Sequence, residues 1–92
     1  MSQSVESGTP KNITGTGTVS IASCNLFGFY VNSTTAGTLV LRVGSDGAAT
    51  GTAISGTITP AIGFHRYPAY CPSGLHATIA NTLDVTLFFA AG

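Results

Sequence analysis

Charged residues are scarce in this chain. They make up 7% of its 92 residues, with three basic and three acidic side chains and a formal net charge of zero, against roughly 25% in an average soluble domain. Lys11, Arg42 and Arg66 are scattered, whereas a nucleic-acid site needs clustered Lys and Arg to neutralise phosphates. We therefore expect no nucleic-acid partner. A surface with so few charges does little to keep molecules apart. This favours a homo-oligomer (a dimer or trimer) or a fixed place in a larger assembly.

Long apolar runs are lacking as well. No run approaches the ~20 residues of a membrane span, and the opening stretch MSQSVESGTPKN has neither the basic nor the apolar region of a secretory signal. We expect no membrane partner, and synthesis in a cytoplasm without export by the general route. The Asn-x-Ser/Thr sequences at Asn12 and Asn32 are accordingly expected to be chance matches, because glycosylation requires the secretory pathway.

Cysteine is limited to Cys24 and Cys71, which have no CxxC spacing. In a reducing compartment two such residues are more often buried thiols than a disulfide. We expect thiols here, although the sequence leaves open whether the two are bridged.

Catalytic patterns are lacking too. The acidic residues are Glu6, Asp46 and Asp84. Nothing in the sequence brings two of these carboxylates together for acid–base hydrolysis. A nucleophile built from Cys71 with His65 or His76 has no accompanying motif. A metal site of the same three residues is conceivable, more so where several subunits meet at a symmetry axis, but its spacing is no recognised zinc pattern. We predict a non-enzymatic protein without catalytic residue, cofactor or metal.

The sequence does have period-two alternation of apolar and polar residues between Gly-rich turns, which predicts β-strands. Its strongest stretch, residues 26–43, reads LFGFYVNSTTAGTLVLRV, two apolar arms joined by the turn residues of NSTTAG. We predict a β-hairpin there, and a second one in residues 75–90 around Asn81-Thr82. Further strands are predicted at residues 12–22, with Val19 and Ile21 on the apolar face, and at residues 52–59 before Pro60, with Ile54 and Ile58 inward. Another is predicted at residues 62–70, where Pro68 indicates an edge strand or a break in the strand.

These strands predict one all-β domain over residues 12–92, an antiparallel two-sheet β-sandwich, jelly-roll-like, of about seven or eight strands. Residues 1–11 are polar and lack periodicity, so we predict a flexible N-terminal arm. In residues 26–43 apolar side chains occupy both faces. One face would meet the opposite sheet, and the other would need cover from a neighbouring subunit.

Residues 62–70, IGFHRYPAY, gather aromatic and polar-headed side chains. Phe64, Tyr67 and Tyr70 suit packing within the domain, then a protein interface in which Arg66 would be an anchor, and lastly a platform for stacking sugar. The sequence leaves the three roles open, in that order of preference.

Three segments together resemble a class of very small bacteriophage structural proteins. They are a strand–turn–strand stretch at Leu26–Gly44, an I-T-P-A-x-G corner within Ile58–Phe64, and a closing G-L-x-x-x-I…D-V-T-L-x-F pattern within Gly74–Phe89. These motifs cover most of the chain after the arm and consist of apolar and turn residues rather than catalytic ones. The stretch His65–Cys71 is the least similar part. The resemblance implies a virion component, either a capsid decoration (cement) protein or a small module of a tail or fibre.

On this resemblance we expect a capsid decoration protein that binds across capsid subunits and stabilises the shell by mass action. Its partners would be the major capsid protein or other virion proteins, and its location the virion. Two alternatives stay open: a tail or fibre module that binds the host surface, and a carbohydrate-binding domain unrelated to a virion. The residues expected at interfaces are Met1, Ser4, Val5, Pro10, Lys11, Phe27, Phe29, Arg42, Phe64, His65, Arg66, Tyr67 and Tyr70.

Overall fold

The structure, a computed structural model, describes residues 9–91. Met1, Ser4 and Val5, predicted at an interface, lie outside the described residues. Within residues 9–91 the chain forms β-strands, one 3-10 turn and no α-helix, so this range holds no helix that could cross a membrane. The elements are β1 (Thr9–Ile13), β2 (Gly17–Ser20), β3 (Cys24–Val43), η1 (Ser45–Gly47), β4 (Thr52–Ala53), β5 (Gly63–Cys71) and β6 (Leu75–Ala91).

All six strands belong to one antiparallel sheet. Its main order is β1-β6-β3-β4, with β2 pairing along β6 and β5 pairing along β3. The all-β, antiparallel prediction is confirmed. Two separate sheets with a jelly-roll arrangement are not supported, because β3 and β6 carry hydrogen bonds from one end of the molecule to the other and join every shorter strand to the same sheet.

The two predicted hairpins are wrong. Residues 26–43 lie in a single strand of 20 residues, β3, and residues 75–90 lie in β6, which has 17. β3 and β6 pair with each other along their whole length, from Cys24 opposite Ala91 to Val43 opposite Leu75. The arms of each predicted hairpin therefore find their partner in the other long strand.

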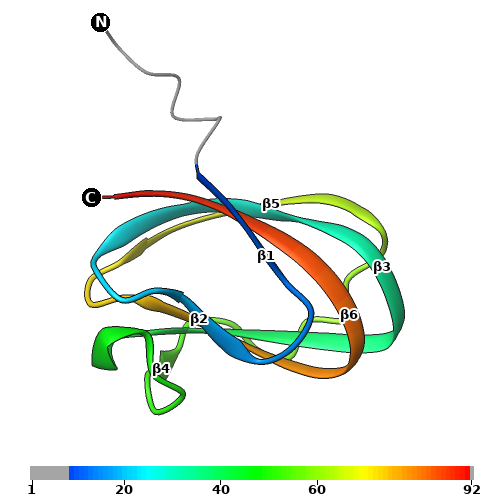
Figure 1. Ribbon diagram of the computed structural model, residues 1–92, viewed down its shortest axis with the longest axis horizontal. Helices are drawn as coiled ribbons and strands as arrows, with labels where there is room; N and C mark the ends of the chain where they lie inside the picture. Colours follow the sequence, from blue (N-terminus) through cyan, green and yellow to red (C-terminus); the bar gives the residue numbers. More distant parts are fainter. Residues whose placement is uncertain (1–8, 92) are drawn as a thin grey trace, which may run out of the picture.

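The predicted turns form a bend instead. Thr35 and Ala36 both lie opposite Thr82, at a register shift, and Ala36 and Asn81 have positive φ angles of 55° and 61°. The Asn81 side chain donates a hydrogen bond of 2.8 Å to the Ala36 carbonyl. The turn residues thus curve both strands together without reversing either, and Figure 1 shows the long pair folding back at this point so that its halves lie at two levels.

The core lies between the two halves of the bent pair. Buried residues from both halves form one cluster, so the inner surface of the sheet packs against itself. The main contributors are Leu26, Phe29, Val31, Leu39, Leu41, Leu75, Ala77, Leu83, Val85 and Leu87.

A β-bulge explains why residues 26–31 are apolar in both registers. The pairing of β3 shifts between Leu26 and Gly28 against both β5 and β6, and an extra residue moves the following side chains to the opposite face. Leu26, Phe29 and Val31 consequently all point into the core, where Phe29 is 2% exposed. The prediction that Phe29 lies at an interface is wrong, since this strand needs no outside cover for it.

The first predicted strand is two strands, β1 and β2, separated by a bend at residues 14–16. β2 ends at Ser20, so Ile21 lies beyond the strand and is 73% exposed, whereas Val19 within the strand is buried as expected. β1 begins at Thr9 and pairs with the end of β6, so Pro10 and Lys11 lie in the sheet although the arm was predicted to extend through residue 11.

The strand predicted at residues 52–59 is short. β4 has two residues, and Ile58 adds an isolated bridge to Leu39. Ile54 and Ile58 pack against the core, as their alternation predicted. β5 pairs with β3 and with no other strand in the described range, which confirms the edge strand that Pro68 indicated.

Candidate functional site

One outward side of the sheet carries most of the exposed aromatic residues. It is formed by β5, the first half of β3, the last half of β6 and β1. On β5, residues 64, 66, 68 and 70 are exposed, whereas residues 65, 67 and 69 are half-buried. We call this side the aromatic face and define it by Phe27, Tyr30, Phe64, Arg66, Tyr70 and Phe88.

The strand register arranges this face in rows. One row across four strands is Asn12, Thr86, Tyr30 and Phe64, and the next is Pro10, Phe88, Gly28 and Arg66. Tyr30, Phe64 and Tyr70 are 43%, 55% and 59% exposed. The sheet therefore offers several half-exposed rings and one cation on a continuous surface.

Gly28 is the position on which this surface depends. The rings of Phe64 on β5 and Phe88 on β6 meet edge to face across β3, with centroids 6.2 Å apart. They can do so because Gly28 between them has no side chain. A Cβ atom there would lie 2.8 Å from Cζ of Phe64.

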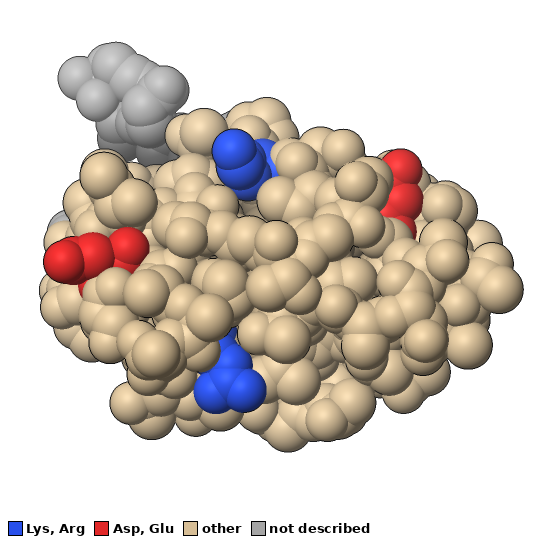
Figure 2. All heavy atoms as spheres, turned by 60° about the horizontal axis from the view of Figure 1, so that its bottom comes forward, with Lys and Arg blue, Asp and Glu red and all other residues tan. Residues whose placement is uncertain are grey.

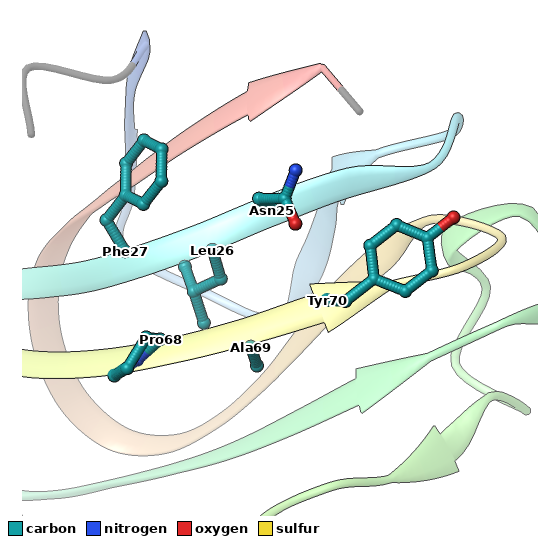
Figure 3. A pocket seen from close by; sticks show the side chains of 6 residues that line it. All are labelled: Asn25, Leu26, Phe27, Pro68, Ala69 and Tyr70. Atoms are coloured by element: carbon teal, nitrogen blue, oxygen red, sulfur yellow. The ribbon is translucent and has the colours of Figure 1, made fainter. Parts of the chain in front are cut away.

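A hollow lies beside the bulge of β3. It has a volume of about 460 Å³ and is lined by Asn25, Leu26, Phe27, Pro68, Ala69 and Tyr70. Figure 3 shows Phe27 and Leu26 pointing to opposite sides of β3, with Pro68 and Tyr70 on the neighbouring strand. The hollow continues the aromatic face towards the end of β5.

A polar cluster borders the aromatic face at Tyr30. The side-chain amides of Asn12 and Asn32 both donate to the same carboxylate oxygen of Asp84, at 2.7 and 3.2 Å. Each also donates to the Thr86 hydroxyl, at 3.1 and 3.2 Å. Asp84, considered above as an acid–base candidate, is thus held between two amides, with no second carboxylate among the residues that hydrogen-bond to it.

We expect Asp84→Ala to lower the free energy of unfolding by about 1 kcal/mol. Two amides would lose a charged acceptor, and hydrogen bonds to charged groups are worth about 1.5–3 kcal/mol when sheltered but less at a solvent-exposed site such as this. Urea denaturation of both proteins measures the difference. Unchanged or increased stability of the variant would show that the cluster does not hold β1 and β3 to β6.

The remaining residues of the predicted aromatic interface point inward. His65 donates from Nε2 to the Ala61 carbonyl at 2.7 Å and its ring lies 5.2 Å from that of Phe29. The Tyr67 hydroxyl donates to the Ile54 carbonyl at 3.0 Å. Of the stretch 64–70, Phe64, Arg66 and Tyr70 therefore reach the surface, whereas His65 and Tyr67 hold β5 to the core.

Arg42 lies on the other half of the sheet and is half-buried. Its guanidinium donates to the Gly51 carbonyl and the Thr78 hydroxyl, both at 3.4 Å. These contacts tie it to its own chain. Figure 2 shows the charged side chains far apart on a surface of uncharged residues, in keeping with the low charge of the sequence.

The three residues considered for a metal have separate environments. His76 is buried and donates from Nδ1 to the Gly47 carbonyl at 3.1 Å, His65 packs on Phe29, and Cys71 ends β5. Across residues 9–91 no three His, Cys, Asp or Glu side chains come together as a metal site. The structure thus gives no support to the metal hypothesis within one chain.

Cys24 and Cys71 are both free and fully buried. They lie directly opposite each other in the β3–β5 pairing. Burial, and after it the adjacent Cys24, raise the pKa of the Cys71 thiol to about 12. Both residues are therefore thiols in this structure, as predicted, and Cys71 keeps its proton at neutral pH.

This pKa predicts a loss of stability in alkali. The folded chain retains the Cys71 proton to about pH 12, whereas an unperturbed thiol loses it near 9.0. Unfolding then releases a proton in this range, so the free energy of unfolding falls as pH rises from about 9 towards 12. Denaturant titrations across this range should show the free energy of unfolding declining less steeply for Cys71→Ala than for the parent chain. Both proteins contain the same tyrosines, so the difference between them reports on Cys71. Equal slopes would contradict the prediction.

Comparison with known proteins identifies no relative: no protein-family model, curated protein or solved structure matches this chain.

Proposed function

We propose that this protein is a non-enzymatic structural subunit of a virion, a capsid decoration protein whose aromatic face binds across capsid subunits and stabilises the shell. The observation that supports this most is the set of half-exposed rings of Tyr30, Phe64 and Tyr70 around Arg66. Aromatic residues and arginine are enriched in protein interfaces, and lysine and acidic residues are depleted. The assignment to a virion rests on the sequence resemblance to small phage structural proteins.

The area of this face is sufficient for a contact of useful strength. An aromatic side chain can bury about 150–250 Å², so covering the exposed half of each ring removes about 100 Å² from water. At about 25 cal/mol per Å² this gives about 2.5 kcal/mol for each ring, before the cost of association. Many weak contacts over a lattice add up through multivalency if the subunit is a dimer or trimer.

The position of Arg66 favours a different molecule as the partner on this face. Arg66 lies in the row next to Tyr30 and Phe64, near the middle of the aromatic face. A twofold axis there would bring two guanidinium groups together, and like charges at a contact are unfavourable. A capsid surface that presents a carboxylate to Arg66 avoids this, so we assign self-association to another part of the chain.

Binding to capsids that lack the protein tests the proposal. We expect Phe64→Ala with Tyr70→Ala to reduce the amount that co-sediments with capsids at least tenfold, because loss of two anchors removes several kcal/mol of contact energy. Ile21→Ala is the matched control, since Ile21 is 73% exposed but lies outside this face. Wild-type binding by the double variant would refute the proposal.

A second function is favoured by the polar cluster beside Tyr30. An aromatic ring next to the amides of Asn12 and Asn32 and the carboxylate of Asp84 has the chemistry to stack on a sugar and bind its hydroxyls. This would suit a tail or fibre module on the host surface. Glycan binding that is lost in Tyr30→Ala, with copies confined to the tail, would favour it over the decoration protein.

A further inference from the structure

The strand register brings the two cysteines of this chain together. Cys24 is the first residue of β3 and Cys71 the last of β5, and the two are direct partners in the antiparallel pairing. Directly opposite residues have Cα atoms about 4.5–5.5 Å apart and side chains on the same face. A disulfide accepts Cα separations of about 4.4–6.8 Å, so the backbone meets this requirement without moving.

The two thiols are also neighbours in the core. Burial and then the nearby Cys24 raise the pKa of the Cys71 thiol, and both side chains are fully buried in the same core cluster. The Cys71 thiol has in addition a weak contact of 3.9 Å with the Ala69 carbonyl. Each cysteine thus has the other as its direct cross-strand neighbour.

We propose that Cys24 and Cys71 form a cross-strand disulfide under oxidising conditions, and that this bond fastens the edge strand β5 to β3 within the native fold. β5 pairs with β3 alone in the described range and carries Phe64, Arg66 and Tyr70. The bond would therefore hold the strand that presents most of the aromatic face. The inference rests on the strand register and does not depend on the proposed function.

The chemistry requires an oxidant, which we take to be a low-molecular-weight disulfide of the glutathione class. One cysteine, as the thiolate, attacks a sulfur of this disulfide and forms a mixed disulfide, releasing one small thiol. The second cysteine attacks the protein sulfur of the mixed disulfide and releases the other small thiol. Two protein thiols are oxidised, one small disulfide is reduced to two thiols, and the two protons end on the released thiols.

Burial makes both directions of this reaction slow in the folded chain. Neither sulfur is accessible, and the high pKa of Cys71 leaves little thiolate. The end of the β3–β5 pair must open before exchange can begin. A bond formed in a transiently opened or newly folding chain would then be sealed in the core and resist reduction.

The test uses the full chain. It is incubated with excess oxidised glutathione in a denaturant concentration that opens the strand end, the denaturant is removed, and the intact mass, near-ultraviolet circular dichroism and thermal unfolding are measured. We expect a monomer that has lost two hydrogen atoms, keeps the native spectrum and unfolds at least about 10 °C higher than the reduced chain. Hydrogen exchange of amides 63–71 should slow at least tenfold. Cys24→Ala, treated identically, should gain one glutathionyl group and no stability.

Four outcomes would overturn the inference. They are a bridged chain that has lost the native spectrum, a bridged chain that unfolds at the same or a lower temperature, stable glutathionylation or intermolecular cross-links in place of the bridge, and thiols that stay unreacted. The first two would show that the native register does not accommodate the bond. The last two would show that the cysteines do not form a pair.

Discussion

Gly28→Ala is expected to destabilise this protein by about 3 kcal/mol or more, at the upper end of the range for single substitutions. An added Cβ would lie 2.4 Å from the His65 carbonyl oxygen and 3.2 Å from Cα of Arg66. Both atoms belong to the backbone of β5 and cannot rotate away as a side chain can. The substitution must therefore separate β3 from β5 or shift the bulge between Leu26 and Gly28.

The measurement is thermal unfolding, where about 3 kcal/mol corresponds to a fall of at least about 12 °C in Tm for a domain of this size. Gly56→Ala is the matched control, because a Cβ at Gly56 has nothing within 4 Å and its φ is not positive. The control should change stability by less than about 1 kcal/mol, and towards an increase. A similar Tm for both variants would show that β5 is not packed closely on Gly28.

The effect should extend to the aromatic face. The Phe64 ring lies next to the space that a Cβ atom of residue 28 would occupy, and it contacts the Phe88 ring over Gly28. Any Gly28→Ala protein that still folds must move the Phe64 ring. We therefore expect its capsid binding to resemble that of the Phe64→Ala, Tyr70→Ala variant, which links the bulge in β3 to the proposed function.

The faces of the last strand could be predicted from the sequence. Val85 and Leu87 alternate with Asp84, Thr86 and Phe88, and the structure buries the first pair and turns the others outward. Period-two alternation is a property of the strand itself, so it needs no knowledge of the partner. The same reasoning found Ile54 and Ile58, and Pro68 marked the edge strand.

The bend could not be predicted in this way. NSTTAG and Asn81-Thr82 have ordinary turn chemistry, and local chemistry shows where a strand departs from regular geometry. Whether the chain then reverses or only bends depends on the partner. Here β6 is long enough to pair with both arms of β3, and this pairing joins residues that are far apart in the sequence, from Val43 with Leu75 to Cys24 with Ala91.

Only part of the candidate site could be predicted from the sequence, because the rest depends on how the strands pair. Phe64, Arg66 and Tyr70 were predicted, but β5 has aromatic residues in both registers, so the sequence could not show that His65 and Tyr67 point inward. The cluster of Asn12, Asn32 and Asp84 depends on the register of three strands, as does the contact of Phe64 with Phe88. The signal for Gly28 is a lone glycine inside an apolar strand, which indicates a bulge or a close backbone approach.

Phe29→Ala should have the second large effect, a loss of about 3–5 kcal/mol in the free energy of unfolding. Phe29 is 2% exposed and packs against the His65 ring at 5.2 Å. Removing a buried aromatic ring forfeits its transfer free energy and leaves a cavity that a close-packed core only partly fills. Total stabilities of small domains are about 5–15 kcal/mol, so a substantial fraction of the variant could be unfolded at 37 °C.

Phe64→Ala is the matched control for this prediction. It removes the same ring from the neighbouring strand, but Phe64 is 55% exposed and lies on the aromatic face. We expect it to cost about 1–2 kcal/mol, clearly less than Phe29→Ala, because only about half of its surface is buried and its loss leaves no closed cavity. Denaturant unfolding of the two variants separates a core position from a binding position. Equal losses would mean that the bulge does not turn Phe29 into the core, and that the face assignments of β3 and β5, on which the proposed binding surface depends, are wrong.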